Sequence, residues 1–383
     1  MTNKKRILIL IESFTPGFKN GGHGRTIRNL IDFYHEDYDF YVFTSDRDIG
    51  DSKPYPNIMS KQWLSVDNAL VSYNEPFRLW LSLHDVIQEN KIDVIFSCGF
   101  FSNYTLRIII DRFLNRIQIP IIVAPMGQFN LGALGFKSNI KKTILYVINK
   151  LNLHKVIYLS VSTEQEATES RELLTNVKTL INEDLPSKNM LALNYHILKE
   201  SGSLRIIYLS RIHPKKNLKY AIDLLKSINA NIVFDIYGPI EDQVYFNQII
   251  EKIKILPINI VVKYKGEVNP QDTISVFSNY HVFLFPTLGE NFGHVIYESL
   301  AAMCIPIIST NTPWNDLEQY TCGYTIPLQQ KDRYIHILNE LAEMDINQLQ
   351  IYRRNAYFYA EKKSNEVFNL RSFEKMIESV GLK

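Results

Sequence analysis

Short apolar segments recur along the first half of the chain, with longer segments of helical period between them. The short segments are rich in β-branched and aromatic residues and are apolar throughout, which is typical of strands covered by helices on both sheet faces. They lie at 7–11, 40–44, 93–97, 120–124 and 156–161, and the helical segments lie at 24–34, 79–90, 103–116, 137–153 and 163–173. This alternation predicts a doubly wound parallel sheet.

The alternation stops near residue 182 and then resumes. Residues 186–203 include Pro186, Ser187 and Gly202 among mixed polar residues, which is typical of a linker. Further strands are predicted at 204–209, 232–237, 260–264, 281–285 and 304–308, with helices at 218–228, 243–254, 272–277 and 292–302. We therefore predict two Rossmann-like domains of the α/β class, at 1–185 and 204–361, facing a central cleft that binds ligands. A final helix at 362–383 is expected to pack back on the first domain.

Composition narrows the class of protein. With 46% apolar and 21% charged residues the chain is an ordinary folded protein, and its length of 383 residues suits two domains. A net charge of +2 argues against a nucleic-acid partner. The apolar run at 7–11 is too short for a signal peptide, and no run of about 18 apolar residues predicts a membrane span. The three distant cysteines are expected to be reduced thiols, so we predict a cytoplasmic protein.

The strongest chemical motif is PTLGENFGHVIYESLAAMCIPIIS, from Pro286 to Ser309. A buried strand, a glycine-bearing loop and a helix follow one another, and such a junction directs backbone N–H groups and a helix dipole at a ligand such as a diphosphate. Glu290 lies in the loop, and Glu298 lies in the helix, within reach of a ribose hydroxyl. The alternative is that Glu290 stabilises the helix dipole and Glu298 is a solvated helix residue.

A second motif, SRIHPKKNLKYAIDLL, places Arg211 and Lys216 between a strand and a helix. A departing nucleoside diphosphate carries about two to three negative charges, which fixed cations stabilise. The alternative, an ordinary basic helix start, is disfavoured because cations oppose the helix dipole there.

A third motif, TPGFKNGGHGRTIRNL, sets Gly21, Gly22 and Gly24 between the first strand and the first helix. Glycines allow the backbone to approach a phosphate closely, although a plain flexible loop is the alternative. The stretch is not a dinucleotide fingerprint, because Ile27 stands where the third glycine belongs.

These motifs together resemble the retaining GT-B glycosyltransferases of the bacterial polysaccharide and lipopolysaccharide type, the glycosyl transferases group 1. Smaller likenesses extend over nearly the whole chain, in APMGQFNLGALGFKSNIKK, VSTEQEA, IYGPIED and NTPWNDLEQYTCGY. The resemblance implies that Glu290 lies against the donor sugar and Glu298 binds the ribose. It implies donor-binding roles for Gly22, for the cations Arg211 and Lys216, and for the backbone of Asn291, Phe292 and Gly293.

The sequence departs from that family at two positions. Asn217 replaces the more usual glycine after Lys216, and Met126 stands where the family often has a histidine or arginine. The second departure means that no basic residue for acceptor chemistry is carried over to this chain.

The resemblance implies transfer of a sugar from a UDP- or GDP-sugar, bound mainly by the domain at 204–361, to a saccharide or lipid-linked acceptor held by the domain at 1–185. The implied process is cell-surface polysaccharide synthesis, with retention of configuration. Glu290, Arg211 and Lys216 are the expected catalytic residues, and no cofactor is expected. Three alternatives stay open: a GT-B enzyme of another reaction type such as an epimerase or phosphorylase, a non-catalytic nucleotide-sugar-binding subunit, and a nicotinamide oxidoreductase. The last is disfavoured, because no strand precedes a complete G-x-G-x-x-G.

Asp46 and Asp48 match the Asp-x-Asp metal motif of the other glycosyltransferase fold. We interpret them as loop carboxylates after the second strand and predict no metal site. The nine histidines show no zinc-ligand spacing.

The segment between Asp93 and Glu164 is basic. Its one acidic residue is Asp111, against Arg107, Arg112, Arg116, Lys137, Lys141, Lys142, Lys150 and Lys155. The predicted helix at 137–153 has an apolar face formed by Ile140, Ile144, Val147, Ile148 and Leu151. A basic amphipathic helix suggests contact with an anionic membrane surface, at the inner face of the cell membrane, or with an acidic acceptor. The alternative is a core-facing helix with a solvated lysine face.

Overall fold

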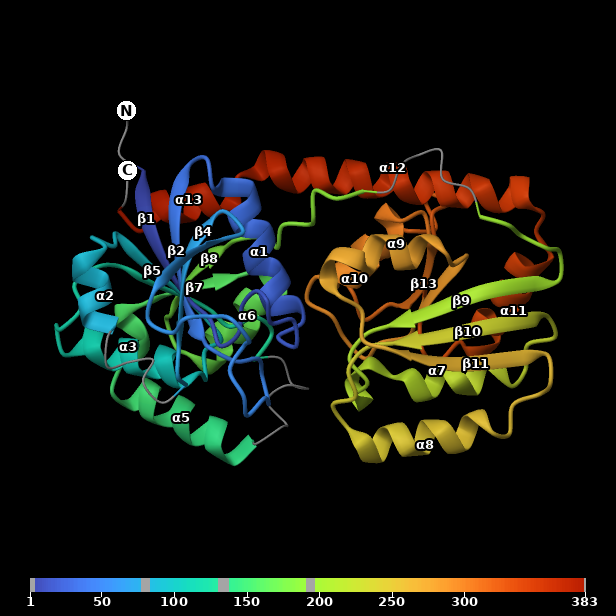
Figure 1. Ribbon diagram of the computed structural model, residues 1–383, viewed down its shortest axis with the longest axis horizontal. Coiled ribbons are helices and arrows are strands. Elements are labelled where there is room, and N and C mark those ends of the chain that lie inside the picture. The colour runs from blue at the N-terminus through green and yellow to red at the C-terminus, as the bar shows by residue number, and fades with distance from the viewer. Residues whose placement is uncertain (1–3, 77–82, 130–137, 191–196, 382–383) are drawn as a thin grey trace. The chain divides into compact units, whose positions relative to one another are not determined.

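The computed structural model describes residues 4–76, 83–129, 138–190 and 197–381, and it divides the chain into two compact units (Figure 1). Unit 1 comprises residues 1–185 and 367–383, and unit 2 comprises residues 186–366. Each unit is a sheet covered by helices on both faces, which confirms the predicted α/β fold class.

Unit 1 contains an eight-stranded sheet among its described residues, with the strand order β3-β4-β2-β1-β5-β6-β7-β8. Its pairs are parallel except for the antiparallel hairpin of β3 and β4. The strands are β1 (Lys5–Leu10), β2 (Tyr38–Ser45), β3 (Trp63–Val66), β4 (Ala69–Asn74), β5 (Val94–Cys98), β6 (Ile121–Ala124), β7 (Tyr158–Val161) and β8 (Lys178–Ile181).

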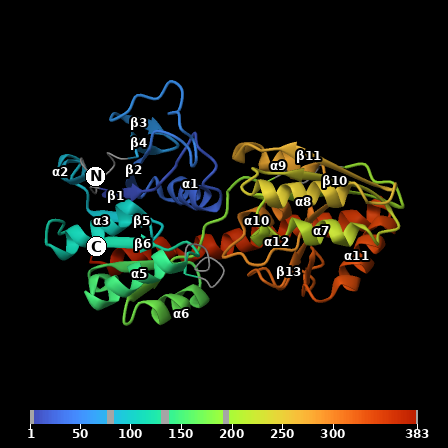
Figure 2. The same ribbon diagram turned by 90° about the horizontal axis from the view of Figure 1, so that it is seen from below.

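Alternate residues of β1 enter two different cores, because successive side chains of a strand point to opposite faces. Ile7 and Ile9 pack against α1 (Gly22–Tyr34) and α13 (Ser372–Ser379). Leu8 and Leu10 belong to the core on the other face, which is covered by α2 (Leu83–Glu89), α3 (Asn103–Phe113), α5 (Ser138–Lys150) and α6 (Glu164–Leu173) (Figure 2). Both faces of the sheet are therefore buried beneath helices, as the uninterrupted apolar runs predict.

Unit 2 contains a parallel sheet of order β11-β10-β9-β12-β13-β14. Its strands are β9 (Ser203–Leu209), β10 (Asn231–Tyr237), β11 (Ile260–Gly266), β12 (Val282–Phe285), β13 (Ile305–Ser309) and β14 (Tyr324–Ile326). Its helices are α7 (Leu218–Leu225), α8 (Gln243–Ile253), α9 (Thr273–Ser278), α10 (His294–Ala301) and α11 (Lys331–Glu343), with short 3-10 turns η2 (Pro214–Lys216) and η3 (Pro270–Asp272).

The unit boundary falls inside α12 (Ile346–Leu370), and α13 follows it in unit 1. Phe373 of α13 is fully buried and contacts the rings of Tyr34, Tyr38, Phe40 and Phe96. This aromatic cluster anchors the end of the chain to the core of unit 1.

One predicted apolar face was wrong in its membership. Two of the predicted residues face the core: Ile148 is buried and Ile144 packs against it. The others are exposed, namely Ile140 and Val147 of α5 and Leu151 just after it, whereas Leu145, which was not predicted, is buried. The helix packs on the sheet through a stripe rotated from the predicted one, and part of its apolar surface remains open to solvent. Lys137, the first residue of the predicted helix, lies outside the described residues.

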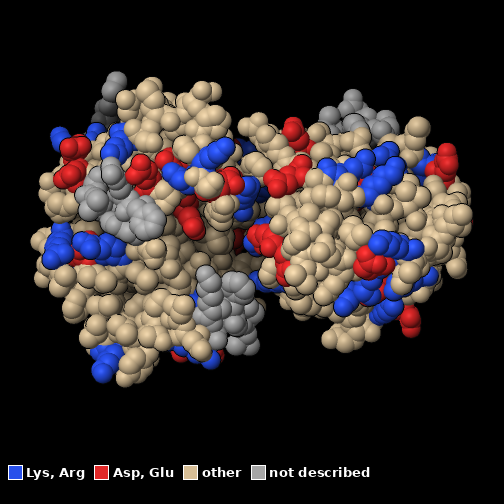
Figure 3. Space-filling view, turned by 60° about the horizontal axis from the view of Figure 1, so that its bottom comes forward, with Lys and Arg blue, Asp and Glu red and all other residues tan. Residues whose placement is uncertain are grey.

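Among the described residues, no helix is both long enough and apolar enough to cross a bilayer. On the face drawn in Figure 3, acidic and basic side chains are interspersed in each unit, in keeping with the small net charge.

Candidate functional site

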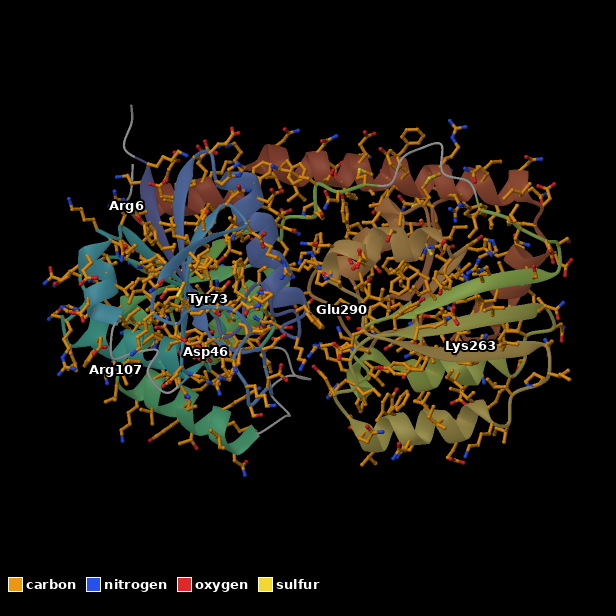
Figure 4. All side chains as sticks on the ribbon, in the orientation of Figure 1. Arg6, Asp46, Tyr73, Arg107, Lys263 and Glu290 are labelled. Atoms are coloured by element: carbon orange, nitrogen blue, oxygen red, sulfur yellow. The ribbon has the colours of Figure 1, made fainter. Side chains whose placement is uncertain are left out.

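Lys216 and Glu290 form an ion pair in unit 2. Lys216 lies at the end of η2, after β9, and Glu290 lies in the loop after β12, where Figure 4 labels it. The Lys216 Nζ–Glu290 Oε1 distance is 2.5 Å, and the two side chains are only 11% and 12% exposed. Thr287 Oγ1 donates to the same carboxylate oxygen at 3.1 Å. Two predicted site residues from distant segments are thus brought together.

Backbone contacts hold the two loops in this position. Leu288 N donates to Lys215 O at 2.9 Å, and the Tyr208 hydroxyl donates to Lys216 O at 3.2 Å. Tyr208 is fully buried in β9, and burial holds its pKa well above the usual value, so the hydroxyl stays a donor. The buried Tyr208 therefore links the backbone of Lys216 to the core of unit 2.

Arg211 belongs to the same strand end but pairs elsewhere. Its Nη1 lies 2.7 Å from Glu241 Oε1, in the segment after β10, and its side chain is 44% exposed. The structure does not join Arg211 to the Lys216–Glu290 pair. Its exposed guanidinium retains donors for a bidentate contact with phosphate oxygens.

The departure at Asn217 has a structural reason. Asn217 adopts a left-handed conformation (φ 57°, ψ 36°) at the start of α7, which glycine adopts readily and asparagine tolerates better than most residues. Its side-chain amide also donates to Pro286 O at 2.9 Å, which a glycine cannot do. Asn217 therefore keeps the required turn and ties the two site loops together.

The loop before α10 is also fixed. Gly293 caps the helix at φ 81°, and a Cβ on Gly293 would lie 2.9 Å from Ile296 Cδ1. The Trp314 indole donates to Phe292 O at 2.5 Å, and its ring packs edge-on against the Phe292 ring. Asn291 precedes these residues in the loop. The helix begins at His294, two residues later than predicted.

Glu298 is buried in α10, with 4% of its surface exposed. The alternative of a solvated helix residue is therefore wrong. A buried carboxylate is costly unless it meets hydrogen-bond donors or cations, so its position calls for a specific partner or ligand.

Gly22 is the first residue of α1 in unit 1, after Gly21, whose φ of 59° and ψ of −126° favour glycine. The preceding loop is organised by Asp48, whose carboxylate accepts hydrogen bonds from Ser13 Oγ, Phe18 N and Lys19 N at 2.5, 2.8 and 3.1 Å. These contacts hold the pKa of Asp48 below its usual value even though burial raises it.

Asp46 pairs with Arg47 at 2.7 Å, and Figure 4 labels it beyond the end of β2. Both carboxylates of the Asp-x-Asp pair therefore bind protein donors, and that of Asp48 holds the loop before Gly21. Within the described ranges, no group of three or more His, Cys, Asp or Glu is arranged to hold a metal ion.

Sequence reasoning missed a histidine at the position of the second departure. His23 Nε2 lies 3.3 Å from Met126 O, where the backbone of Met126 is left-handed (φ 52°). His23, the second residue of α1, thus places an imidazole beside the segment that follows β6. The histidine is visible in the sequence as the third residue of GGHG, but only the glycines of that segment were interpreted.

Residues 196–358 match the sequence profile of the glycosyl transferases group 1. No curated protein sequence matches the chain.

Several solved structures share the whole fold. The Anabaena protein Alr3699/HepE in complex with UDP and glucose has a TM-score of 0.68 at 15% identity, over 98% of this chain and 100% of that one. Trehalose-6-phosphate synthase from E. coli, bound with UDP-2-fluoro glucose, has a TM-score of 0.65 at 11% identity, over 98% and 99%. WaaG, a glycosyltransferase involved in lipopolysaccharide biosynthesis, has a TM-score of 0.62 at 12% identity, over 96% and 98%.

Proposed function

We propose that this chain, which has the GT-B fold and whose residues 196–358 match the glycosyl transferases group 1, is a glycosyltransferase. It would transfer a sugar from a UDP-sugar to a saccharide or lipid-linked acceptor, with retention of configuration. The choice of uridine rests on the UDP and UDP-sugar ligands named for the Anabaena and E. coli structures. The proposed pathway is cell-surface polysaccharide synthesis, in keeping with the lipopolysaccharide role named for WaaG.

The Lys216–Glu290 pair is the observation that carries the proposal. A nearly buried cation beside a carboxylate, with an exposed arginine on the same strand end, suits a ligand that joins a diphosphate to a sugar. Lys216 and Arg211 would stabilise the charge that grows on the leaving diphosphate, and Glu290 would accept hydrogen bonds from the sugar hydroxyls. The Glu298 carboxylate and the backbone of Asn291, Phe292 and Gly293 would complete the donor site in unit 2.

A panel of nucleotide sugars tests this assignment. A ligand that binds the native state raises the melting temperature, so UDP and UDP-sugars should stabilise the protein more than GDP- or ADP-sugars. NMR of the first product formed should show the anomeric configuration of the donor. Stabilisation by NAD alone, with none by any nucleotide sugar, would contradict the proposal.

Transfer is proposed to need no metal, because protein groups supply the cations expected at the diphosphate. Activity should survive EDTA at a concentration that strips weakly bound divalent ions. Loss of activity that manganese restores would revive Asp46 and Asp48 as ligands.

Unit 1 is proposed to bind the anionic cytoplasmic face of a membrane, where a lipid-linked acceptor would reside. Two helices of this unit, which both contact the 3-10 turn η1 (Leu153–Val156), carry exposed apolar side chains. These are Ile110 and Phe113 of α3 with the following Leu114, and Ile140, Tyr146 and Val147 of α5 with the following Leu151. Basic residues accompany them: Arg107, Arg112, Arg116, Lys142 and Lys150. Exposed apolar groups among cations are typical of surfaces that bind anionic lipid.

A further inference from the structure

The segment after β13, residues 309–314, holds the loop that carries Glu290. We call that loop, residues 287–293 between β12 and α10, the donor loop. Three of its backbone atoms bond to the segment, and these are Thr287 O with Ser309 Oγ at 2.5 Å, Glu290 N with Asn311 O at 3.1 Å, and Phe292 O with Trp314 Nε1 at 2.5 Å. The last two bonds bracket Asn291, so the backbone expected to bind the donor is held on both sides.

Trp314 is itself fixed in the core of unit 2, with 5% of its surface exposed. Its indole packs against the rings of Phe292, Tyr297 and Tyr359, at centroid distances of 5.4, 6.4 and 6.2 Å. Its carbonyl oxygen accepts a hydrogen bond from Thr325 Oγ1 at 2.7 Å. An indole N–H only donates, so a buried one needs an acceptor, and here that acceptor belongs to the donor loop.

The bond from Trp314 decides which way the Phe292–Gly293 peptide faces. In a planar trans peptide the C=O and N–H groups point in opposite directions, so holding Phe292 O on the side of the indole turns the Gly293 N–H away from it. Gly293 lies at φ 81°, and a glycine adopts either sign of φ because it has no Cβ to oppose the change. That peptide could therefore rotate if the indole N–H were absent.

We propose that Trp314 is a positioning residue of the donor site, whose indole N–H keeps the donor loop in the conformation that binds the sugar diphosphate. The inference rests on the proposed glycosyl transfer, in which Glu290 and the backbone of residues 291–293 contact the sugar and the diphosphate. The ribose is assigned instead to Glu298, in the helix after the loop. Because binding depends on how exactly the contacting groups are placed, loss of the indole N–H should weaken contacts to the diphosphate and spare those to the nucleoside.

Calorimetry on the full chain with UMP and with UDP separates the two contributions. The wild type should bind UDP more tightly than UMP, because UDP adds the phosphate that reaches the donor loop. Trp314→Phe keeps an aromatic ring but loses the donor. It should weaken UDP binding about three- to tenfold, the range expected for one neutral hydrogen bond, and bind UMP like the wild type. Thr325→Val, which removes the bond to the Trp314 carbonyl, should shift the ratio of UDP to UMP affinity in the same direction by a smaller factor.

Tyr220→Phe is the matched control, because it also removes a donor to a backbone carbonyl of unit 2, the bond from the Tyr220 hydroxyl to Leu328 O at 2.6 Å. It should lower the melting temperature as Trp314→Phe does and keep the wild-type ratio of UDP to UMP affinity. Failure of the wild type to bind UDP would overturn the proposed function itself. If the wild type binds UDP but Trp314→Phe keeps both affinities, or loses both equally, only the positioning role is overturned. If Trp314→Phe does not fold, a wild-type ratio in Thr325→Val overturns that role alone.

Discussion

The Lys216 ammonium and the Glu290 carboxylate lie 2.5 Å apart, although 74 residues separate them in the chain. Each was expected to bind the donor, one at the diphosphate and the other at the sugar. Their contact means that the two functions are coupled: removing either side chain leaves the other as a nearly buried charge without its partner. Such a charge is costly, so the pair also fixes the two loops that carry it.

Turnover should depend on the cations more than donor binding does. Lys216→Ala and Arg211→Ala should each lower kcat by about a hundredfold or more, because their charge acts on the diphosphate as the glycosidic bond breaks. Steady-state kinetics with a separate measurement of donor affinity checks this. Lys219→Ala, an exposed lysine of α7, is the control and should keep the wild-type kcat. A rise in KM with unchanged kcat would contradict a leaving-group role.

Glu298→Ala should weaken binding of the nucleotide sugar, because a carboxylate hydrogen bond to the ribose contributes about 1.5–3 kcal/mol. Calorimetry with UDP measures the loss, and the 2′-deoxy nucleotide should bind the variant and the wild type alike. The residue is buried, so the melting temperature without ligand must be compared as well. Unchanged UDP affinity in a folded variant would refute the ribose contact.

Asn217 offers a test of backbone and side-chain contributions. Asn217→Ala should destabilise unit 2 by about 2–3 kcal/mol, since an L-residue other than Asn or Gly pays about 1–2 kcal/mol in the left-handed region and the bond to Pro286 O is lost. Asn217→Gly loses only the side-chain bond and should cost about 1 kcal/mol. Urea denaturation measures both. Equal stability of the two variants would show that the left-handed turn is not the constraint.

The strands and helices could largely be predicted from the sequence, because apolar runs bounded by turn residues carry their own signal. The β3–β4 hairpin was missed because β3 is short and only partly buried. Its signal was present: Asp67 and Asn68 are both left-handed, with φ 46° and 61°, as in the two-residue turns that join antiparallel strands.

The site was predictable only in part. Local motifs indicated Arg211, Lys216 and Glu290 separately, but which of these side chains meet depends on the strand order. In the structure Arg211 pairs with Glu241, and Lys216 pairs with Glu290. Likewise, helical period indicated an apolar face on α5 but not which of its residues the sheet covers, because a helix that exposes apolar residues has two candidate stripes. Long-range packing decided both.

His281 should make the protein less stable as the pH falls. Its Nδ1 accepts a hydrogen bond from Arg205 N and its Nε2 donates to Leu198 O, both at 2.9 Å, so the buried ring is held neutral. Burial, the largest cause, lowers its pKa from 6.5 to about 4. Between these values the unfolded chain binds the proton and the native state does not, so stability decreases from about pH 7 toward pH 4.

Urea denaturation at pH 7 and pH 5 tests this contribution. The wild type should lose about 2 kcal/mol more over that interval than His281→Gln, which lacks the titrating group. Identical pH dependence of the two proteins would show that His281 titrates normally in the native state.

Membrane binding should follow from the exposed surface of α3 and α5. Each lysine near an anionic surface contributes about 1 kcal/mol, and the exposed Tyr146 and Val147 add apolar burial. The protein should therefore sediment with vesicles containing anionic lipid at low salt and less with neutral vesicles. Binding should weaken as salt rises, because the Debye length falls from about 10 Å at 0.1 M to about 3 Å at 1 M.

Charge-reversal variants test whether the exposed surface of α5 is the one that binds the membrane. Lys142→Glu/Lys150→Glu on α5 should abolish sedimentation with anionic vesicles, whereas Lys263→Glu/Lys265→Glu on the exposed β11 of unit 2 changes the net charge equally and should leave it intact. Tyr146→Ser should reduce binding at high salt most, since only the apolar contribution survives screening there. If the two double variants lose binding equally, net charge and not this surface drives association. If the wild type ignores anionic vesicles at low salt, the lysines of α5 form an ordinary solvated face, and a soluble saccharide becomes the expected acceptor.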